Sequence, residues 1–231
     1  MYIVLNHKSN FTYDEIITYR KNLSKIKTTT TLIVCPSSCY LPLFSNMTLG
    51  AQDVSSKGFG AYTGDISAAA LKSLSVKYVL INHSEHHCYH HDTVLDIKGK
   101  LKQVKANDLI PIICIGETKE QHTAKNYVKN LIDQLQQLLE GLDLEKYMIA
   151  YEPVFSIGTN ELLDSKELAA VIKHLQEHFQ VPILYGGGIS EKTIAKIKTI
   201  PYLSGVLLGT SSLDLSKTVK IIQTLEQVPI E

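Results

Sequence analysis

The chain has 231 residues, a hydrophobic fraction of 44%, and 23 basic against 23 acidic side chains, so its formal net charge is zero. This balance gives no reason to expect a nucleic acid or an anionic membrane surface as a partner, and any bound anion must be held by local geometry. No run of the sequence approaches the roughly 18 apolar residues of a membrane span, and the segment MYIVLNHKSN lacks the basic and long apolar regions of a signal peptide.

The four cysteines, Cys35, Cys39, Cys88 and Cys114, lack the paired spacing of metal sites. Cys35 and Cys114 stand in the apolar runs TLIVC and PIICIG. We interpret both as reduced core residues and expect the protein to be cytoplasmic.

Short apolar runs alternate with longer helical stretches along the whole chain. We expect eight strands, at residues 2–5, 31–35, 48–51, 78–81, 110–115, 148–151, 183–185 and 205–208. Apolar residues three or four positions apart predict helices in residues 13–26, 93–107, 124–140 and 165–179. Start signals for helices are Asp65, Ser165, and Ser190 with Glu191.

Eight such units predict a single domain, residues 1–231, folded as an α/β barrel of eight parallel strands, a (β/α)8 barrel. No linker or change of composition divides the chain. The rival is an open doubly wound sheet, which usually carries a glycine-rich loop after its first strand. This chain has NHKSN there. In a barrel, the residues that follow each strand are the candidates for catalysis.

Two of these candidates follow the first expected strand, and one follows the fourth. Asn6 and Lys8 project to the same side if the chain is extended, and Lys8 could hold an anion, although an ordinary surface lysine is the alternative. His83 ends an apolar run, and Ser84 could cap the next helix. Beside a helix N-terminus an imidazole is favoured in its neutral form and can donate a hydrogen bond to a carbonyl; a packed core histidine is the alternative.

A metal site is a further interpretation of this region, because five histidines fall within nine positions: His83, His86, His87, His90 and His91. The spacing of His83 and His87 suits zinc. No cysteine pair lies nearby, however, and Glu85 does not complete an H-E-x-x-H pattern. We therefore expect solvated helix residues and no metal.

Glu152 follows the sixth strand, in the stretch IAYEPVFSIGT. A partly desolvated carboxylate at a barrel mouth is suited to removing a proton from carbon, and a structural ion pair is the alternative. The segment 153–159 could close over the site, because Pro153 stiffens one end and Gly158 frees the backbone at the other.

Glycine-rich loops follow the last two strands. YGGGIS contains Gly186 to Gly188 and leads to a helix expected at Glu191, and LGTSSL contains Gly209 and Thr210. Loops at these places often bind phosphate through backbone N–H groups. Together the candidates suit proton transfer beside the carbonyl of a small phosphorylated substrate.

The chain resembles the triosephosphate isomerase family over essentially its whole length. The stretches that carry the resemblance are NHKSN, AQDVSSKGFGAYTGDIS, YVLINHSE, PIICIGET, AYEPVFSIGT, YGGGIS and GVLLGTSSL. The resemblance implies interconversion of D-glyceraldehyde 3-phosphate and dihydroxyacetone phosphate in glycolysis and gluconeogenesis, without a cofactor.

The resemblance also implies a role for individual residues. Glu152 would be the base and His83 the electrophile, Lys8 and Asn6 would bind substrate, and Glu85 would support them. Gly158, Gly188, Gly209 and Thr210 would hold the phosphate through their backbone N–H groups. Thr63, in GFGAYTGD, would reach Asn6 and Lys8 of the partner subunit in a homodimer.

The chain departs from the family pattern at several of these places. Thr210 stands where a second glycine is usual, Gly188 where a serine is usual, and Asn82 where a glycine precedes the histidine. Phe155 and Ser156 replace a tryptophan and an alanine, and Asp65 and His86 replace a glutamate and an arginine near the subunit contact.

Two other functions are compatible with parts of the pattern. Another phosphate-binding barrel enzyme would also have a GGGI loop, and a degenerate barrel could serve as a binding or scaffold protein. Neither has a physical need for Lys8, His83 and Glu152 together.

Overall fold

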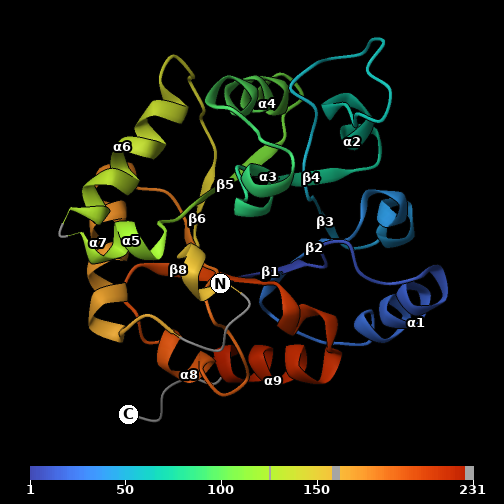
Figure 1. The fold of residues 1–231 in the computed structure, drawn as a ribbon. Coiled ribbons are helices and arrows are strands. Elements are labelled where there is room, and N and C mark those ends of the chain that lie inside the picture. Colours follow the sequence, from blue (N-terminus) through green and yellow to red (C-terminus); the bar gives the residue numbers. More distant parts are fainter. Residues whose placement is uncertain (125, 158–161, 227–231) are drawn as a thin grey trace.

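Eight parallel strands close into a barrel in the computed structural model, which describes residues 1–124, 126–157 and 162–226 (Figure 1). Each strand pairs with the next in chain order, and the first pairs with the eighth, with Tyr2 opposite Gly205. The strands are β1 Tyr2–Asn6, β2 Thr31–Cys35, β3 Thr48–Ala51, β4 Val76–Ile81, β5 Ile110–Ile115, β6 Met148–Tyr151, β7 Ile183–Tyr185 and β8 Leu203–Leu208. The predicted barrel is confirmed, and the open sheet is excluded by the β1–β8 pairing.

Helices surround the strands on the outside of the barrel (Figure 1). Within the described residues, none of them is long and apolar enough to cross a membrane. The α-helices are α1 Tyr13–Leu23, α2 Ala68–Ser73, α3 Ser84–Tyr89, α4 Val94–Ala106, α5 Lys119–Thr123, α6 Tyr127–Leu139, α7 Ser165–Phe179, α8 Ile194–Ile197 and α9 Leu215–Glu226. The part of the chain that the structure describes also contains three 3₁₀ helices: η1 Ser38–Phe44, η2 Val154–Ser156 and η3 Thr210–Leu213.

The alternation of side chains along the strands divides the core into two parts. One cluster, which includes Val4, Leu80, Ala150 and Leu184, contains only strand residues among its buried members and fills the barrel. The other cluster contains the intervening strand residues together with the apolar faces of the helices. Since successive strand side chains point to opposite faces, a residue two positions beyond an interior residue also faces inward.

The helix α2 begins at a cap other than the predicted one. Its cap is Ser67, whose Oγ accepts a hydrogen bond from the N–H of Ala70 at 3.2 Å. Asp65 lies two residues before this cap, and its Oδ2 accepts from Oγ of Ser55 at 2.5 Å. The prediction of Asp65 as a helix start is therefore wrong.

The helix α7 is capped one residue before the predicted start. Oδ1 of Asp164 accepts hydrogen bonds from the N–H groups of Lys166 at 2.9 Å and Glu167 at 3.3 Å. A carboxylate adds a favourable charge at the positive end of the helix. Ser165 is the first helical residue and does not cap.

The helix α8 starts later than predicted from Ser190 and Glu191. It begins at Ile194, after a turn in which Oγ1 of Thr193 accepts from the N–H of Ser190 at 2.8 Å and donates to the carbonyl oxygen of Gly188 at 3.1 Å. Residues 191–193 form this turn, and the helix expected at Glu191 is wrong.

Candidate active site

Four strands deliver side chains or glycines to the inner face at the carboxyl end of the barrel. Interior residues Val4, Ala150, Leu184 and Leu207 are each followed two positions later by a residue of the candidate site. These residues are Asn6, Glu152, Gly186 and Gly209. The strand period therefore gathers residues from four distant parts of the chain at one mouth.

Glu152 is 4% exposed and lies at the end of β6. Its N–H donates to the carbonyl oxygen of Ile115 at 2.8 Å, which continues the sheet pairing by one residue. Its side chain fills the space in front of Gly186, where a Cβ atom would lie 2.5 Å from Cγ of Glu152. Glycine at position 186 is thus required by the place of the carboxylate.

The carboxylate of Glu152 faces the imidazole of His83, which is 5% exposed at its side chain. Oε2 of Glu152 lies 3.8 Å from Nε2 of His83. Within the described chain, Nε2 of His83 and Oε1 of Glu152 are buried and have no hydrogen-bond partner. Two polar atoms that face one small volume without a protein partner are suited to contact with a substrate.

A left-handed residue turns the chain after β4 and sets the position of His83. Asn82 has a φ of 67°, a conformation that asparagine tolerates better than most residues. Its Nδ2 donates to the carbonyl oxygen of Cys114 at 2.7 Å, and its Oδ1 lies 2.7 Å from Nε2 of His87. The side chain of Asn82 thus makes two contacts that hold this turn, and one of them pairs it with His87.

The hydrogen bonds of His83 determine its tautomer. Nδ1 accepts from the N–H of Glu85 at 3.2 Å, so it carries no proton and the neutral ring is protonated at Nε2. His83 itself is the N-cap of α3, and the predicted cap, Ser84, is the first helical residue. The expected neutral histidine is therefore supported by the bond at Nδ1.

Lys8 extends into the same region from the loop after β1. Its Nζ lies 2.5 Å from Oε1 of Glu85, and Oε2 of Glu85 is 3.8 Å from Nδ1 of His83. The chain is not extended here, because Lys8 has a φ of 52°. Oδ1 of Asn6 accepts from the N–H of Lys8 at 3.1 Å, and Nε2 of Gln52 donates to its carbonyl oxygen at 2.8 Å. These bonds stabilise the left-handed backbone, and the side chain is not that of an ordinary surface lysine.

A cavity of about 490 Å³ adjoins these residues. Its lining includes Lys8, Glu152 and most of the predicted phosphate-binding residues: Gly188, Gly209 and Thr210. Gly209 is close to Lys8, since a Cβ atom there would lie 3.3 Å from the lysine Cε. The structure therefore brings the base, the lysine and the glycine loops to one cavity, while Gly158 lies outside the described residues.

Two lysines that were not among the predicted site residues also line this cavity. Lys192 lies in the turn before α8, and Lys217 lies in the first turn of α9. Both add positive charge beside the backbone N–H groups of the loops. Their signal in the sequence was weak, because each is one of many lysines and only its place after a glycine loop distinguishes it.

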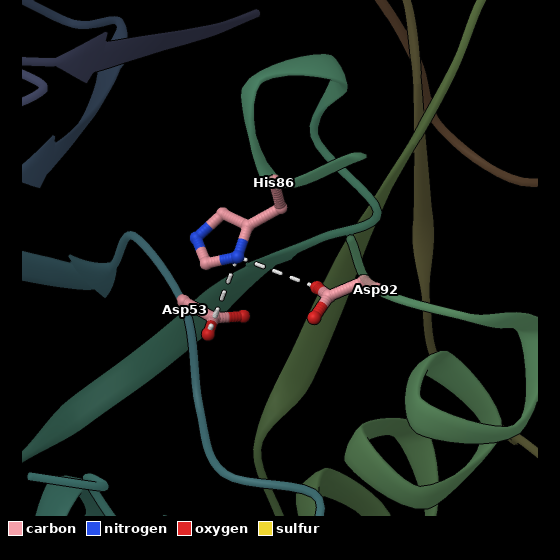
Figure 2. Close-up of side chains that lie close together, drawn as sticks. All are labelled: Asp53, His86 and Asp92. Atoms are coloured by element: carbon pink, nitrogen blue, oxygen red, sulfur yellow. Dashed lines mark ion pairs between the residues drawn. The ribbon is translucent and has the colours of Figure 1, made fainter. Parts of the chain in front are cut away.

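Figure 2 shows a separate cluster of Asp53, His86 and Asp92, whose potential ligand atoms lie within 4.8 Å of one another. Nδ1 of His86 is 3.3 Å from Oδ2 of Asp92 and 3.7 Å from Oδ2 of Asp53. The buried Lys100 binds both carboxylates, with its Nζ 2.6 Å from Asp92 and 2.8 Å from Asp53. Because this ammonium group already supplies a positive charge, we interpret the cluster as an ion-pair network.

The residue predicted at a subunit contact, Thr63, lies in an exposed loop. All residues from 57 to 65 are exposed, and the loop presents Phe59 at 82% and Tyr62 at 45% exposure. Exposed aromatic side chains of this size gather at protein interfaces more often than elsewhere on a surface.

Comparisons with known proteins agree over nearly the whole chain. A family model described as triosephosphate isomerase matches residues 1–225. A protein of Campylobacter hominis named triosephosphate isomerase is 32% identical over 98% of this chain and 100% of its own. Proteins of the same name from a Wolbachia of Brugia malayi and from Mesomycoplasma hyorhinis are 35% and 34% identical, over 97% and 88% of this chain and 97% and 86% of their own. The chain belongs to the triosephosphate isomerase family.

Proposed function

We propose that this protein is an aldose–ketose isomerase that interconverts D-glyceraldehyde 3-phosphate and dihydroxyacetone phosphate, in glycolysis and gluconeogenesis, without a cofactor. The observation that carries the proposal is the pair formed by Glu152 and His83, 3.8 Å apart beside a cavity lined by glycine loops. A base and a hydrogen-bond donor that face one point are what proton transfer next to a carbonyl requires.

Glu152 performs the carbon chemistry in this proposal. As a carboxylate it takes one proton from C1 of dihydroxyacetone phosphate, and the electron pair of that C–H bond forms the C1–C2 double bond while the C2 oxygen becomes negatively charged. The resulting carboxylic acid then returns the proton to C2. The substrate gains and loses no atoms, since the proton moves from one carbon to its neighbour.

His83 transfers protons between the two substrate oxygen atoms, those on C1 and C2. Its Nε2–H donates a hydrogen bond to the C2 oxygen as negative charge develops there. The ring then moves a proton from the C1 oxygen to the C2 oxygen, which converts the hydroxyl of C1 into the aldehyde and the carbonyl of C2 into a hydroxyl. The bond from the Glu85 N–H occupies the lone pair of Nδ1, so the proton that the ring exchanges with the substrate is the one on Nε2.

The remaining candidate residues bind the substrate and stabilise the negative charge that develops on it. Lys8 and Asn6 contact the substrate, and the lysine ammonium group stabilises the enediolate; Glu85 holds that ammonium group in place. The phosphate is held by the backbone N–H groups of Gly188, Gly209 and Thr210, with Gly158 as a further donor. Lys192 and Lys217 add attraction for the dianion at the cavity wall.

We further propose that the protein acts as a homodimer in the cytoplasm. The exposed loop of residues 57–65 would insert Thr63 beside Asn6 and Lys8 of the partner subunit, and Phe59 and Tyr62 would be covered by that contact. The cysteines form no disulfide, and Cys35 and Cys114 are buried, which suits a reducing compartment.

A coupled assay tests the isomerase directly. Purified protein is given glyceraldehyde 3-phosphate, and the formation of dihydroxyacetone phosphate is followed through its reduction by a second enzyme. We expect turnover that 2-phosphoglycolate inhibits competitively. Folded protein that binds phosphoglycolate without turnover would favour a scaffold, and turnover of a different phosphorylated sugar would favour another enzyme of this fold.

A further inference from the structure

A buried carboxylate outside the catalytic set is hydrogen-bonded to the segment that carries the base. Glu117 follows β5 and is 2% exposed. Its Oε1 accepts a hydrogen bond from the hydroxyl of Tyr151 at 3.0 Å and lies 3.0 Å from Nδ1 of His122, while Oε2 is buried without a hydrogen-bond partner among the described residues. Burial raises the pKa of Glu117. An ionised carboxylate in this place therefore needs a positive charge beside it.

The ring of His122 lies between two carboxylates. Its Nδ1 is 3.0 Å from Oε1 of Glu117, and its Nε2 is 3.2 Å from Oε1 of Glu167 in the first turn of α7. The contact at Nδ1 is a hydrogen bond, and the contact at Nε2 is an approach within ion-pair distance. The ring of His122 therefore connects the segment after β5 to the first turn of α7.

Residues on both sides of Glu152 make hydrogen bonds to Glu117. Tyr151, the residue before the base, donates its hydroxyl to Glu117, and the N–H of Val154 donates to the carbonyl oxygen of Glu117 at 3.0 Å. The ring of Phe155 packs against the ring of His122, with their centroids 4.8 Å apart. A movement of His122 or Glu117 would therefore be transmitted to residues 151–155, which carry the base.

We propose that His122 is a positioning residue for Glu152, because it lies between Glu117 and Glu167 and so fixes the segment that carries the base. This inference rests on the proposed function, in which Glu152 removes the proton. His122 touches no substrate atom and acts through Glu117 and Tyr151.

The surroundings of His122 show what its loss would change. The groups that face it are the carboxylates of Glu117 and Glu167 and the rings of Tyr127 and Phe155, whose centroids lie 4.7 and 4.8 Å from that of His122. Without the imidazole, the buried Glu117 would lose one of its hydrogen-bond partners, so the segment around Glu152 would shift and kcat would fall.

Three variants test the inference by steady-state kinetics. His122→Gln keeps hydrogen-bonding capacity without a charge, and His122→Arg supplies a permanently charged donor. His174→Gln is the matched control, since His174 is 52% exposed on the outer face of α7. We expect His122→Gln to lower kcat about fivefold to tenfold with little change in KM, as for the loss of a charged hydrogen bond.

Rescue by a second cation and the split between kcat and KM separate a positioning role from a merely structural one. We expect His122→Arg to restore kcat, while His174→Gln follows the wild type. Equal kcat values for wild type and His122→Gln, or a kcat in His122→Arg no higher than in His122→Gln, would overturn the inference. If the wild type catalysed no isomerisation, the proposed function would fail instead.

Discussion

Glu152 and His83 approach each other at the mouth of the barrel with their reactive atoms buried. Burial keeps water away from the carboxylate, so less solvation has to be removed when it takes a proton from carbon. A hydrogen bond holds each residue in place. The N–H of Glu152 donates to the carbonyl oxygen of Ile115, and the N–H of Glu85 donates to Nδ1 of His83. The reactive ends therefore point to a common position.

Replacement of the base is the most direct test at the scale of one residue. Glu152→Gln keeps the size of the side chain and removes the charge that accepts the proton, so we expect kcat to fall roughly a thousandfold or more. Phosphoglycolate, measured by calorimetry, should still bind. Glu145→Gln, an exposed control, should leave both quantities unchanged. Equal losses of binding and rate in Glu152→Gln would argue for a structural role.

His7 is a second residue whose environment has a measurable consequence. It is fully buried, and its ring packs against Phe11, Tyr19 and Phe44 with centroid distances of 5.3, 4.7 and 6.2 Å. Neither ring nitrogen has a hydrogen-bond partner within the described chain. Desolvation lowers the pKa of His7 from 6.5 to about 4. The native state therefore holds His7 neutral where an unfolded chain would protonate it.

The sign of the pH effect follows from that difference. Between pH 6.5 and about 4 the unfolded state binds the extra proton, so the free energy of unfolding decreases as the pH falls through this window and is intact above it. The full loss is about 3 kcal/mol. We expect His7→Phe to remove this contribution, which denaturant unfolding at neutral and acid pH measures as a smaller difference than in the wild type. A parallel pH dependence in both proteins would contradict the burial effect.

The loop after β7 shapes the site because its glycines have no side chain. A Cβ atom at Gly186 would lie 2.5 Å from Cγ and 2.8 Å from Oε2 of Glu152, and one at Gly187 would lie 2.3 Å from Oγ of Ser156. These glycines make room for the base and for the segment after it. From the sequence, Gly186 to Gly188 were predicted to bind phosphate. That Gly186 and Gly187 also make room for Glu152 and Ser156 depends on the pairing of β6 with β7.

Adding one methyl group at position 186 tests whether the loop must make room for Glu152. We expect Gly186→Ala to displace the carboxylate and to lower kcat about a hundredfold, because small misplacements of a catalytic group are costly. Gly141→Ala is the control: it has nothing within 4 Å of the added Cβ, and its φ of 74° affects stability and not the site. Thermal unfolding checks that Gly186→Ala folds, and wild-type kcat in that variant would show that the loop can move aside.

Helix starts show how far element boundaries follow from local sequence. All eight strands were predicted, five with the observed bounds, because runs of apolar residues between polar segments are a strong signal. Asp65, Ser165 and Ser190 were all plausible caps, yet Ser67, Asp164 and Thr193 occupy the cap positions. Several capping residues stand close together in each case, and the direction in which the chain leaves the strand decides between them.

At the scale of the whole molecule, closure of the barrel assembles the site from distant parts of the chain. β1 pairs with β8, so the loops after these strands are neighbours and Lys8 lies against Gly209. The loop of residues 57–65, which follows β3, is exposed along its whole length. That exposed loop is the part of the molecule for which we propose a partner subunit.

A charged side chain in this loop tests the assembly. Thr63→Arg would bring a long cation next to Lys8 of the partner subunit, so we expect dissociation of the dimer and loss of most activity. Sedimentation velocity measures the first effect, and the coupled assay measures the second. Thr18→Arg, on the exposed face of α1, should change neither. An unchanged sedimentation coefficient for Thr63→Arg would exclude the proposed interface.

The sequence by itself determined the barrel and the identity of the main candidates, because strand periodicity and the residues that follow each strand are local properties. The tertiary structure decided what those residues do together: the 3.8 Å approach of Glu152 to His83, the left-handed backbone of Lys8, and the two lysines of the cavity wall. It also decided that His122 lies between two carboxylates. These contacts join segments far apart in the chain, and only closure of the barrel fixes their distances.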